Sequence, residues 1–292
     1  YAGFGVWAIV AQNLFNQLVD TIILWVTVKW RPQLVFSFKR LKGLFSYGWK
    51  LLVSSLLDTG YNNLRQLIIG KLYTAKDLSF FNKGQSFPNM IVTNINSSID
   101  SVLLPTMSAE QDDKSRVRAM TRRAIKTSTY IMMPLMMGLA VCAEPLVSLI
   151  LTDKWLPCVP FLRIFCFTYA FYPIHTANLN AIKAMGRSDM FLKLEIAKKA
   201  FGLVVLVSTM WFGVIWMAYS LLLTSLFSQI INSFPNKKLL EYGYIQQLKD
   251  MLPQIALSCA MGFCVYLLNY VGLPVIVTLI LQVAVGAVLY II

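Results

Sequence analysis

The stretch that decides the fold runs from residue 114 to residue 151 and reads KSRVRAMTRRAIKTSTYIMMPLMMGLAVCAEPLVSLIL. Residues 114–126 carry six Lys and Arg side chains, whereas residues 127–151 carry none. A helix needs about 20 mostly apolar residues to cross a bilayer. Positive side chains next to such a helix are retained on the cytoplasmic side. The stretch therefore predicts a transmembrane helix that leaves the cytoplasm at a basic loop.

Eight further stretches share this length and apolar character, namely 4–28, 46–70, 80–105, 156–182, 196–212, 214–234, 248–269 and 273–292. Of the 292 residues, 57% are hydrophobic and only 13% are charged, with a mean hydropathy of +0.63. An ordinary soluble domain has a more polar composition. The sequence therefore predicts an all-α bundle of nine transmembrane helices. The stretch 196–212 is long enough only if Lys198 and Lys199 extend their ammonium groups to the membrane interface.

Positive charge alternates along the chain. Nineteen of the 26 Lys and Arg residues lie in every second gap between the apolar stretches, at 29–45, 106–126, 183–199 and 237–249. The other gaps contain only Lys71, Lys76 and Lys154. Because positive loops stay in the cytoplasm, we expect the basic gaps to be cytoplasmic and residue 1 to lie outside. The chain opens with Tyr1 directly beside a predicted span, so we also expect it to be a fragment that lacks an amino-terminal block.

Composition also narrows the classes of function. The net charge of +13 is spread over short loops beside predicted spans, where it sets orientation and contacts anionic lipid headgroups. Membrane lipids, and not nucleic acid, are therefore the expected partners. His175 is the only histidine, the five cysteines lack metal-ligand spacing, and no phosphate-binding loop is present, so we expect no metal, no cofactor and no enzyme activity. The pair Asp112–Asp113 indicates a solvated helix start rather than a glycosyltransferase metal site.

Three of the predicted spans carry many polar residues, and in the second and third these fall at steps of three and four, which places each row on one helix face. These are Ser54, Asp58, Tyr61, Asn62 and Arg65 in the second span; Asn82, Gln85, Asn89, Thr93, Asn96 and Asp100 in the third; and Arg163, His175, Asn178 and Asn180 in the fifth. A charge at mid-bilayer costs at least about 2.5–3.5 kcal/mol, so these faces turn toward protein or water. Two interpretations stay open: the wall of a hydrated lumen, or interhelical hydrogen bonds worth about 0.6 kcal/mol each. Pro173 is placed to kink the fifth span.

The helical rise of about 1.5 Å per residue allows the depth of each ionisable residue to be compared. It predicts an outer layer of three cations, Arg65, Lys83 and Arg163. The inner layer holds two carboxylates and the histidine, namely Asp58, Asp100 and His175. The candidate substrate-binding residues are Arg65, Lys83, Arg163, Asn62, Asn89 and Asn96, and the candidates for coupling transport to a proton or cation are Asp58, Asp100 and His175.

Short motifs at helix ends and turns carry a resemblance to a known family. They are Gly5-Val-Trp7-Ala8, Lys29-Trp30-Arg31-Pro32, Phe45-Ser-Tyr-Gly48, Ile68-Ile-Gly70-Lys71, Lys154-Trp155-Leu-Pro157-Cys-Val-Pro160, Tyr172-Pro173-Ile-His175 with Asn178-Leu-Asn180, and Gly186-Arg187-Ser188-Asp189. In these motifs, over about residues 3–255, the chain resembles the Wzx-type oligosaccharide-lipid flippases of the polysaccharide transporter family. That family belongs to the multidrug/oligosaccharidyl-lipid/polysaccharide exporter superfamily, whose fold is MATE-like.

The resemblance implies two six-helix lobes around a central cavity, often followed by two further helices. Residues 1–30 would then be the last helix of an amino-terminal lobe, residues 31–236 a six-helix carboxy-terminal lobe, and residues 237–292 the appended pair. It also implies a substrate, a polyprenyl-pyrophosphate-linked oligosaccharide, that the lobes move across the bacterial inner membrane by alternating access. The product would serve lipopolysaccharide, O-antigen or exopolysaccharide biosynthesis, and polysaccharide assembly proteins are further candidate partners.

Two other functions stay open at this point. A multidrug or metabolite exporter of the same superfamily would have more carboxylates than cations in its cavity. A polysaccharide polymerase or membrane glycosyltransferase would need a long loop on the outside, whereas the outside gaps here are about ten residues or shorter.

Overall fold

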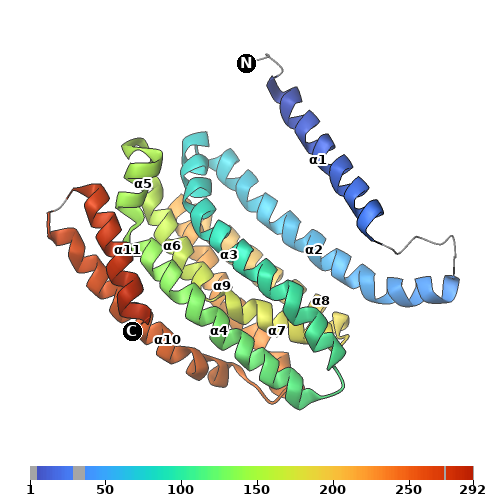
Figure 1. Cartoon of the computed structure of the whole chain (residues 1–292). Coiled ribbons are helices and arrows are strands. Elements are labelled where there is room, and N and C mark those ends of the chain that lie inside the picture. The colour runs from blue at the N-terminus through green and yellow to red at the C-terminus, as the bar shows by residue number, and fades with distance from the viewer. Residues whose placement is uncertain (1–4, 29–36, 273, 292) are drawn as a thin grey trace. The chain divides into compact units, whose positions relative to one another are not determined.

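A computed structural model describes residues 5–28, 37–272 and 274–291, and these residues form helices and no β-strand (Figure 1). The helices are α1 (Gly5–Thr27), α2 (Phe38–Leu72), α3 (Ala75–Ala109), α4 (Lys114–Val141), α5 (Ala143–Leu151), α6 (Val159–Ala170), α7 (Tyr172–Ala184), α8 (Ser188–Thr209), α9 (Val214–Leu239), α10 (Tyr244–Leu267) and α11 (Val275–Ile291). Two short 3₁₀ segments, Asp153–Cys158 and Leu268–Tyr270, precede α6 and follow α10. The predicted all-α class is confirmed.

The chain divides into two compact units, residues 1–44 and residues 45–292. The first contains α1 and the start of α2, and the second contains the rest of α2 and all later helices. The packing and the site described below belong to residues 45–292.

Each of the nine predicted stretches contains a helix. The described residues include four helical segments that are long and apolar enough to cross a membrane, Lys114–Val141, Asp153–Ala184, Val214–Leu239 and Tyr244–Tyr270, and a shorter apolar helix at Val275–Tyr290. The chain is therefore a multi-pass membrane protein. Helices α2 and α3, which carry the polar rows, and α8, which carries Lys198 and Lys199, are not among these segments. The count of nine transmembrane helices therefore stays a prediction.

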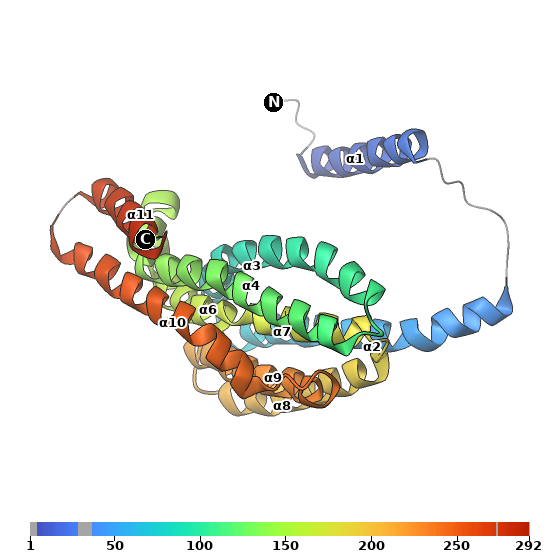
Figure 2. The same ribbon diagram turned by 60° about the horizontal axis from the view of Figure 1, so that its bottom comes forward.

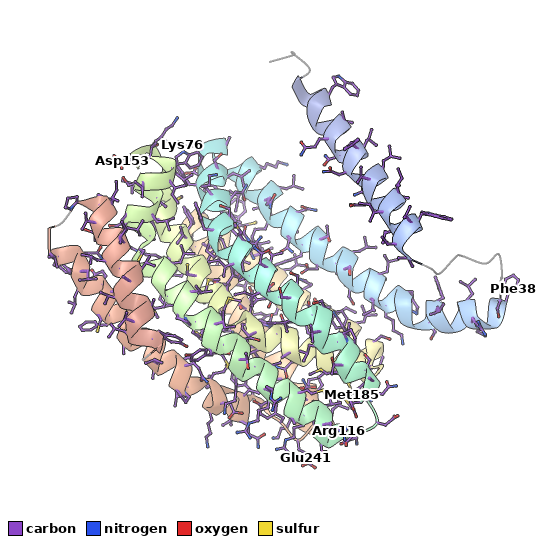
Figure 3. The ribbon with its side chains drawn as sticks, viewed as in Figure 1. Phe38, Lys76, Arg116, Asp153, Met185 and Glu241 are labelled. Carbon is purple, nitrogen blue, oxygen red and sulfur yellow. The ribbon has the colours of Figure 1, made fainter. Side chains whose placement is uncertain are left out.

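Residues near the turns of the second unit lie at two opposite ends of its helix bundle (Figure 3). Lys76 and Asp153 lie at one end, and Arg116, Met185 and Glu241 lie at the opposite end. The last three residues belong to the basic gaps 106–126, 183–199 and 237–249. These gaps share one end of the bundle, as their alternation predicted. The motif Lys29-Trp30-Arg31-Pro32, in the remaining basic gap, lies outside the described residues.

The basic gap 106–126 is largely helical, because α4 begins at Lys114, well before the predicted span. Asp113 caps this helix: its side chain accepts hydrogen bonds from the backbone N–H groups of Ser115 (2.9 Å) and Arg116 (3.1 Å). Such a cap satisfies donors that the first helical turn leaves without partners. The helix start predicted at Asp112–Asp113 is confirmed.

The predicted fifth span is broken into α6 and α7 at Phe171. Pro173 has no backbone N–H, and its ring conflicts with the carbonyl of Tyr169, four positions earlier. The turn is tightened instead, and the Ile174 N–H donates to the Phe171 carbonyl at 3.2 Å. The predicted kink at Pro173 is confirmed.

Helices α3 and α6 pack in direct backbone contact at Gly84. A Cβ atom on Gly84 would lie 2.9 Å from both the Cys158 carbonyl oxygen and the Leu162 nitrogen, so only glycine fits at this crossing. One turn earlier, the ring of Phe81 meets that of Phe165 edge to face, with 5.2 Å between centroids. This contact lies in the hydrophobic core and holds α3 and α6 in a fixed register.

Helices α10 and α11 lie side by side at the edge of this unit, with α10 along α4 (Figures 1 and 2). Arg122 of α4 donates to Asp250 of α10 through Nε and Nη2, both at 2.7 Å. Tyr290 of α11 donates to the carbonyl of Tyr130 at 2.8 Å. These contacts attach both helices to α4, and their assignment as an appended pair stays a prediction.

Candidate functional site

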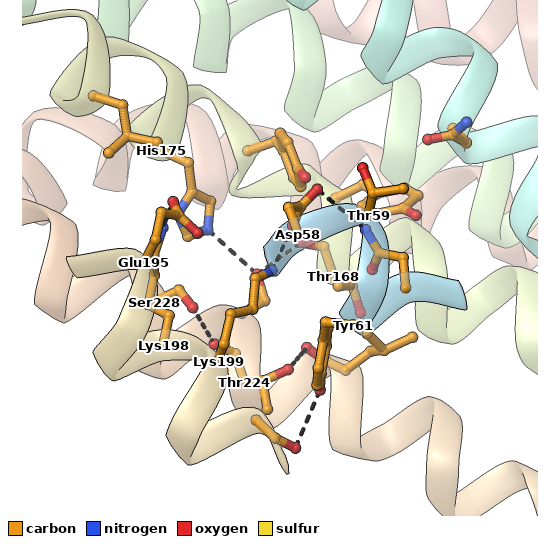
Figure 4. Close-up of a pocket in the computed structure, with 18 of the residues that line it drawn as sticks. Asp58, Thr59, Tyr61, Thr168, His175, Glu195, Lys198, Lys199, Thr224 and Ser228 are labelled. Carbon is orange, nitrogen blue, oxygen red and sulfur yellow. Dashed lines mark hydrogen bonds and ion pairs between the residues drawn. The ribbon is translucent and has the colours of Figure 1, made fainter. Parts of the chain in front are cut away.

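A cavity of about 1020 Å³ opens within residues 45–292, between α2, α3, α6, α7, α8 and α9 (Figure 4). Its walls are mostly polar. The ionisable residues that line it are Asp58, Arg65, Asp100, His175, Lys183, Glu195, Lys198 and Lys199. Within the described part of the chain, four basic side chains therefore face three carboxylates and one histidine.

Six of the nine predicted site residues line this cavity: Arg65, Asn62, Asn89, Asp58, Asp100 and His175. The polar rows of α2 and α3 share it, because Asn82 and Gln85 also lie on its wall. Thr93 and Asn96 of the α3 row are not among the described lining residues, and the interpretation of these faces as the wall of a hydrated lumen stays a prediction.

The other three predicted residues, Lys83, Arg163 and Asn96, are not among the described residues that line the cavity. The guanidinium of Arg163 pairs with Glu144 at 3.0 Å, and the ammonium of Lys83 lies 5.5 Å from the centre of the Trp155 ring. Lys83 follows a cavity residue, Asn82, by one position, which turns it about 100° around the helix. The predicted outer layer of three cations therefore does not form around the cavity.

Asn96 is half-buried, and its Oδ1 atom has no hydrogen-bond partner among the described residues.

Arg65 is the most enclosed cation of the cavity, with only 3% of its surface exposed. Its Nη1 atom donates to the Met217 carbonyl (2.7 Å) and to Ser220 Oγ (2.8 Å), and its Nη2 atom donates to the Tyr61 hydroxyl (2.7 Å). Across residues 5–28, 37–272 and 274–291, no carboxylate pairs with Arg65, and its Nε atom has no partner. A buried charge without a counter-charge costs on the order of several kcal/mol. An anion in the cavity would supply such a counter-charge.

Lys198 and Lys199 are the cavity residues that sequence reasoning placed elsewhere. Lys199 pairs with Asp58 of α2, and Lys198 pairs with Glu195 one turn earlier (Figure 4). Their side chains are only 18% and 10% exposed. From the sequence alone, these lysines were considered only as side chains that could extend to the membrane interface from the short stretch 196–212. Helix α8 instead begins at Ser188, so Lys198 lies about 15 Å along it. The sequence signal for such a pair was a Glu and a Lys three positions apart, Glu195 and Lys198, within an apolar stretch.

Helix α7 presents its polar residues in two directions. Asn180 faces the cavity and donates to Asp100 at 2.5 Å. Asn178 instead lies inside the protein, where it donates to Gln247 of α10 (2.8 Å) and accepts from Asn236 of α9 (2.6 Å). The interpretation as interhelical hydrogen bonds is therefore correct for Asn178.

The single histidine is held between α7 and α9. His175 Nδ1 lies 3.0 Å from Asn232 Nδ2, and His175 Nε2 lies 3.4 Å from Ser225 Oγ. The amide and hydroxyl groups around it fix the orientation of the ring. In the residues that the structure describes, no group of three or more His, Cys, Asp or Glu side chains could hold a metal ion.

Residues 1–160 match the model of a family described as polysaccharide biosynthesis protein. The chain belongs to this family. The resemblance predicted from the sequence motifs is thereby confirmed, and the matched part of this polysaccharide biosynthesis protein includes the cavity faces of α2 and α3.

The chain is also similar in sequence to two proteins that are named for biosynthesis. The chain is 25% identical over 185 residues to the teichuronic acid biosynthesis protein TuaB of Bacillus subtilis, which covers 63% of this chain and 38% of that protein. It is 23% identical over 188 residues to the succinoglycan biosynthesis transport protein ExoT of Rhizobium meliloti, which covers 63% of this chain and 37% of that protein. The chain thus spans less than two fifths of the length of these two relatives.

The fold matches a solved structure, the lipid II flippase MurJ in its inward closed conformation. The TM-score is 0.73 at 17% identity, and the match covers 94% of this chain and 58% of the flippase chain. At this identity the likeness concerns the fold, and it places the helices of this family member in a MurJ-like arrangement.

Proposed function

We propose that this chain is part of a flippase that moves a lipid-pyrophosphate-linked oligosaccharide across the bacterial inner membrane. The product would serve lipopolysaccharide, O-antigen or exopolysaccharide synthesis. Membership of the polysaccharide biosynthesis family, a relative named as a transport protein and a MurJ-like fold all support this proposal. The single observation that supports it most strongly is the polar cavity. Its most buried cation, Arg65, has no carboxylate partner among the residues that the structure describes.

The size of the cavity suits the head group of such a substrate. Its volume of about 1020 Å³ lies at the upper end of the range of about 300–1,000 Å³ that is usual for small-molecule pockets. The lipid chain would stay in the bilayer. A guanidinium can donate two parallel hydrogen bonds to a phosphate group, and in this proposal Arg65 would donate such bonds. The amides of Asn62 and Asn89 can hydrogen-bond sugar hydroxyls.

The two lysines would supply further positive charge. Lys199 is paired with Asp58, and Lys198 is paired with Glu195. An arriving diphosphate would compete with these carboxylates for the ammonium groups. Asp58 would then be free to take up a proton or a cation, which offers a route for coupling. Asp100 and His175 are the other lining residues that we propose for coupling.

Transport would proceed by rocking of two lobes around this central site. In this proposal residues 1–30 are the last helix of one lobe, 31–236 form the other lobe, and 237–292 are two appended helices. The end that carries Arg116, Met185 and Glu241 would face the cytoplasm, because basic turns are retained there. The chain would bind and move its substrate without breaking a covalent bond.

The alternative of a cationic-drug exporter is less well supported. It predicts an excess of carboxylates, whereas the described lining has four basic and three acidic side chains.

The proposal is tested with the full-length protein in vesicles that contain a fluorescent lipid-pyrophosphate-linked oligosaccharide. The fraction of substrate that reaches the other leaflet is measured over time. Arg65→Gln is expected to lower the initial rate at limiting substrate about 10- to 100-fold, because hydrogen bonds to a charged group contribute about 1.5–3 kcal/mol.

Arg163→Gln is the matched control, because this arginine pairs with Glu144 away from the cavity. It is expected to leave the rate within about twofold of the unaltered protein. Wild-type rates in Arg65→Gln at equal protein level would remove Arg65 from the site. Absence of any translocation by the unaltered protein would reject the flippase itself.

A further inference from the structure

Tyr61 of α2 lies between two cations of the cavity that come from different helices. Its hydroxyl accepts a hydrogen bond from Arg65 of α2 at 2.7 Å. Its ring centre lies 4.9 Å from the ammonium of Lys199 of α8, and Figure 4 labels both Tyr61 and Lys199. The guanidinium carbon of Arg65 lies 5.4 Å from the same ring centre. Since 4.9 Å and 5.4 Å share one centroid, the two charges lie no more than about 10 Å apart.

The hydroxyl of Tyr61 is fixed in one orientation. It donates to the backbone carbonyl of Gly202 at 3.1 Å. Because its single proton is committed to this carbonyl, its lone pairs are left to accept from Arg65. A Cβ atom on Gly202 would lie 2.8 Å from the Tyr61 hydroxyl oxygen. Only glycine at position 202 therefore allows the hydroxyl to reach the helix backbone.

The ring acts on the second cation. A cation over an aromatic face is attracted by the ring quadrupole, most strongly where water is excluded, and Tyr61 is only 9% exposed. Asp58 competes for the same ammonium from the more open side, where its side chain is 54% exposed. Lys199 therefore stays beside the Tyr61 ring when its ion pair with Asp58 opens.

From this geometry we infer that Tyr61 is a positioning residue, which holds Arg65 and Lys199 close enough together for two linked phosphate groups to contact both. The inference rests on the proposed function and adds a specificity to it: the cavity would select a diphosphate over a monophosphate. With hydrogen bonds of about 2.8 Å at each end, one diphosphate can span two charges up to about 10 Å apart. A monophosphate offers less charge and fewer acceptor oxygens with which to engage both cations.

The inference is tested by binding of two probes, geranylgeranyl diphosphate and geranylgeranyl monophosphate, to the purified full-length protein in detergent. Tyr61→Phe keeps the ring beside Lys199 and removes the acceptor for Arg65. It is expected to weaken diphosphate binding about tenfold and to change monophosphate binding by less than about twofold. A purely structural role would weaken the binding of both probes alike.

Gly202→Ala is a second variant in case Tyr61→Phe is poorly folded. Its added methyl group would push the hydroxyl aside, so it is expected to reproduce the loss of diphosphate selectivity. In the Tyr61→Phe background the same alanine is expected to have little further effect, because the displaced atom is already absent. Additive effects of the two changes would contradict a shared mechanism.

Arg65→Gln separates failure of this inference from failure of the proposed function. If Arg65→Gln abolishes diphosphate binding but Tyr61→Phe leaves the ratio of the two affinities unchanged, the positioning role alone is rejected. If Arg65→Gln binds diphosphate as well as the unaltered protein does, the proposed anion site is rejected, and the role of Tyr61 with it.

Discussion

Asp58 of α2 and Lys199 of α8 form an ion pair across the wall of the cavity, although 141 residues separate them in the sequence. Asn62 supports the carboxylate from the same helix, with its Nδ2 atom 3.2 Å from Asp58 Oδ2. The Asp58 side chain is 54% exposed and that of Lys199 is 18% exposed, so water reaches the pair from the Asp58 side; solvent-exposed ion pairs contribute about 0–1 kcal/mol to stability. The pair can therefore open for a competing anion without loss of the fold.

Asp58→Asn is expected to tighten the binding of geranylgeranyl diphosphate about three- to fivefold. The change removes the negative charge that neutralises Lys199 and keeps an amide that can hydrogen-bond Asn62. A gain of up to about 1 kcal/mol corresponds to this factor. Glu110→Gln is the control, since Glu110 forms a similar ion pair with Arg116 at an exposed helix end. Unchanged or weaker diphosphate binding in Asp58→Asn would show that the carboxylate does not compete with the ligand.

Gly84→Ala is expected to destabilise the protein by about 1–3 kcal/mol, as overpacking of a filled core usually does. The added Cβ would meet backbone atoms of Cys158 and Leu162, which cannot rotate away as a side chain can. Gly138→Ala is the matched control: the new Cβ would have nothing within 4 Å, and alanine favours a helix by up to about 1 kcal/mol over glycine. Thermal unfolding in detergent measures both changes. A melting temperature for Gly84→Ala equal to that of Gly138→Ala would contradict the tight crossing of α3 and α6.

The positions of the helices could be predicted because hydropathy and helix breakers act locally. Every predicted apolar stretch contains a helix, the kink follows from Pro173, and the start of α4 follows from Asp113. The cavity faces of α2 and α3 were also predictable. Polar residues at steps of three and four share one side of a helix whatever packs against it, which is how Arg65 and Asn89 were found.

The rest of the site depends on how each helix is rotated against its neighbours, and the period of one helix does not contain that information. Lys83 and Arg163 were therefore grouped with Arg65 by depth, although each contacts a different partner away from the cavity. Lys199 was considered only as a side chain that could extend to the interface, because an isolated sequence shows a lysine near a predicted helix end but not its carboxylate partner. Only the folded chain brings Lys199 of α8 within reach of Asp58 of α2.

Asp113 provides a test of the helix start at the basic end of the bundle. Hydrogen bonds from the side chain of Ser115 and the backbone N–H of Arg116 hold the pKa of the Asp113 carboxyl below its usual range. A carboxyl whose pKa is lower in the folded than in the unfolded state stabilises the fold above its unfolded pKa, near 4. That stabilisation is lost as the pH falls through the folded pKa. Asp113→Ala is therefore expected to lower the melting temperature at pH 7.

The difference in melting temperature between Asp113→Ala and the unaltered protein is expected to shrink as the pH falls from 7 toward 3, because protonation removes the charged acceptor from the unaltered protein as well. Asp112→Ala is the matched control: Asp112 is the preceding exposed carboxylate, and the cap of α4 is made by Asp113 alone. It is expected to melt like the unaltered protein across this range. A loss in Asp113→Ala that stays constant with pH would mean that its carboxylate charge does not stabilise the first turn of α4.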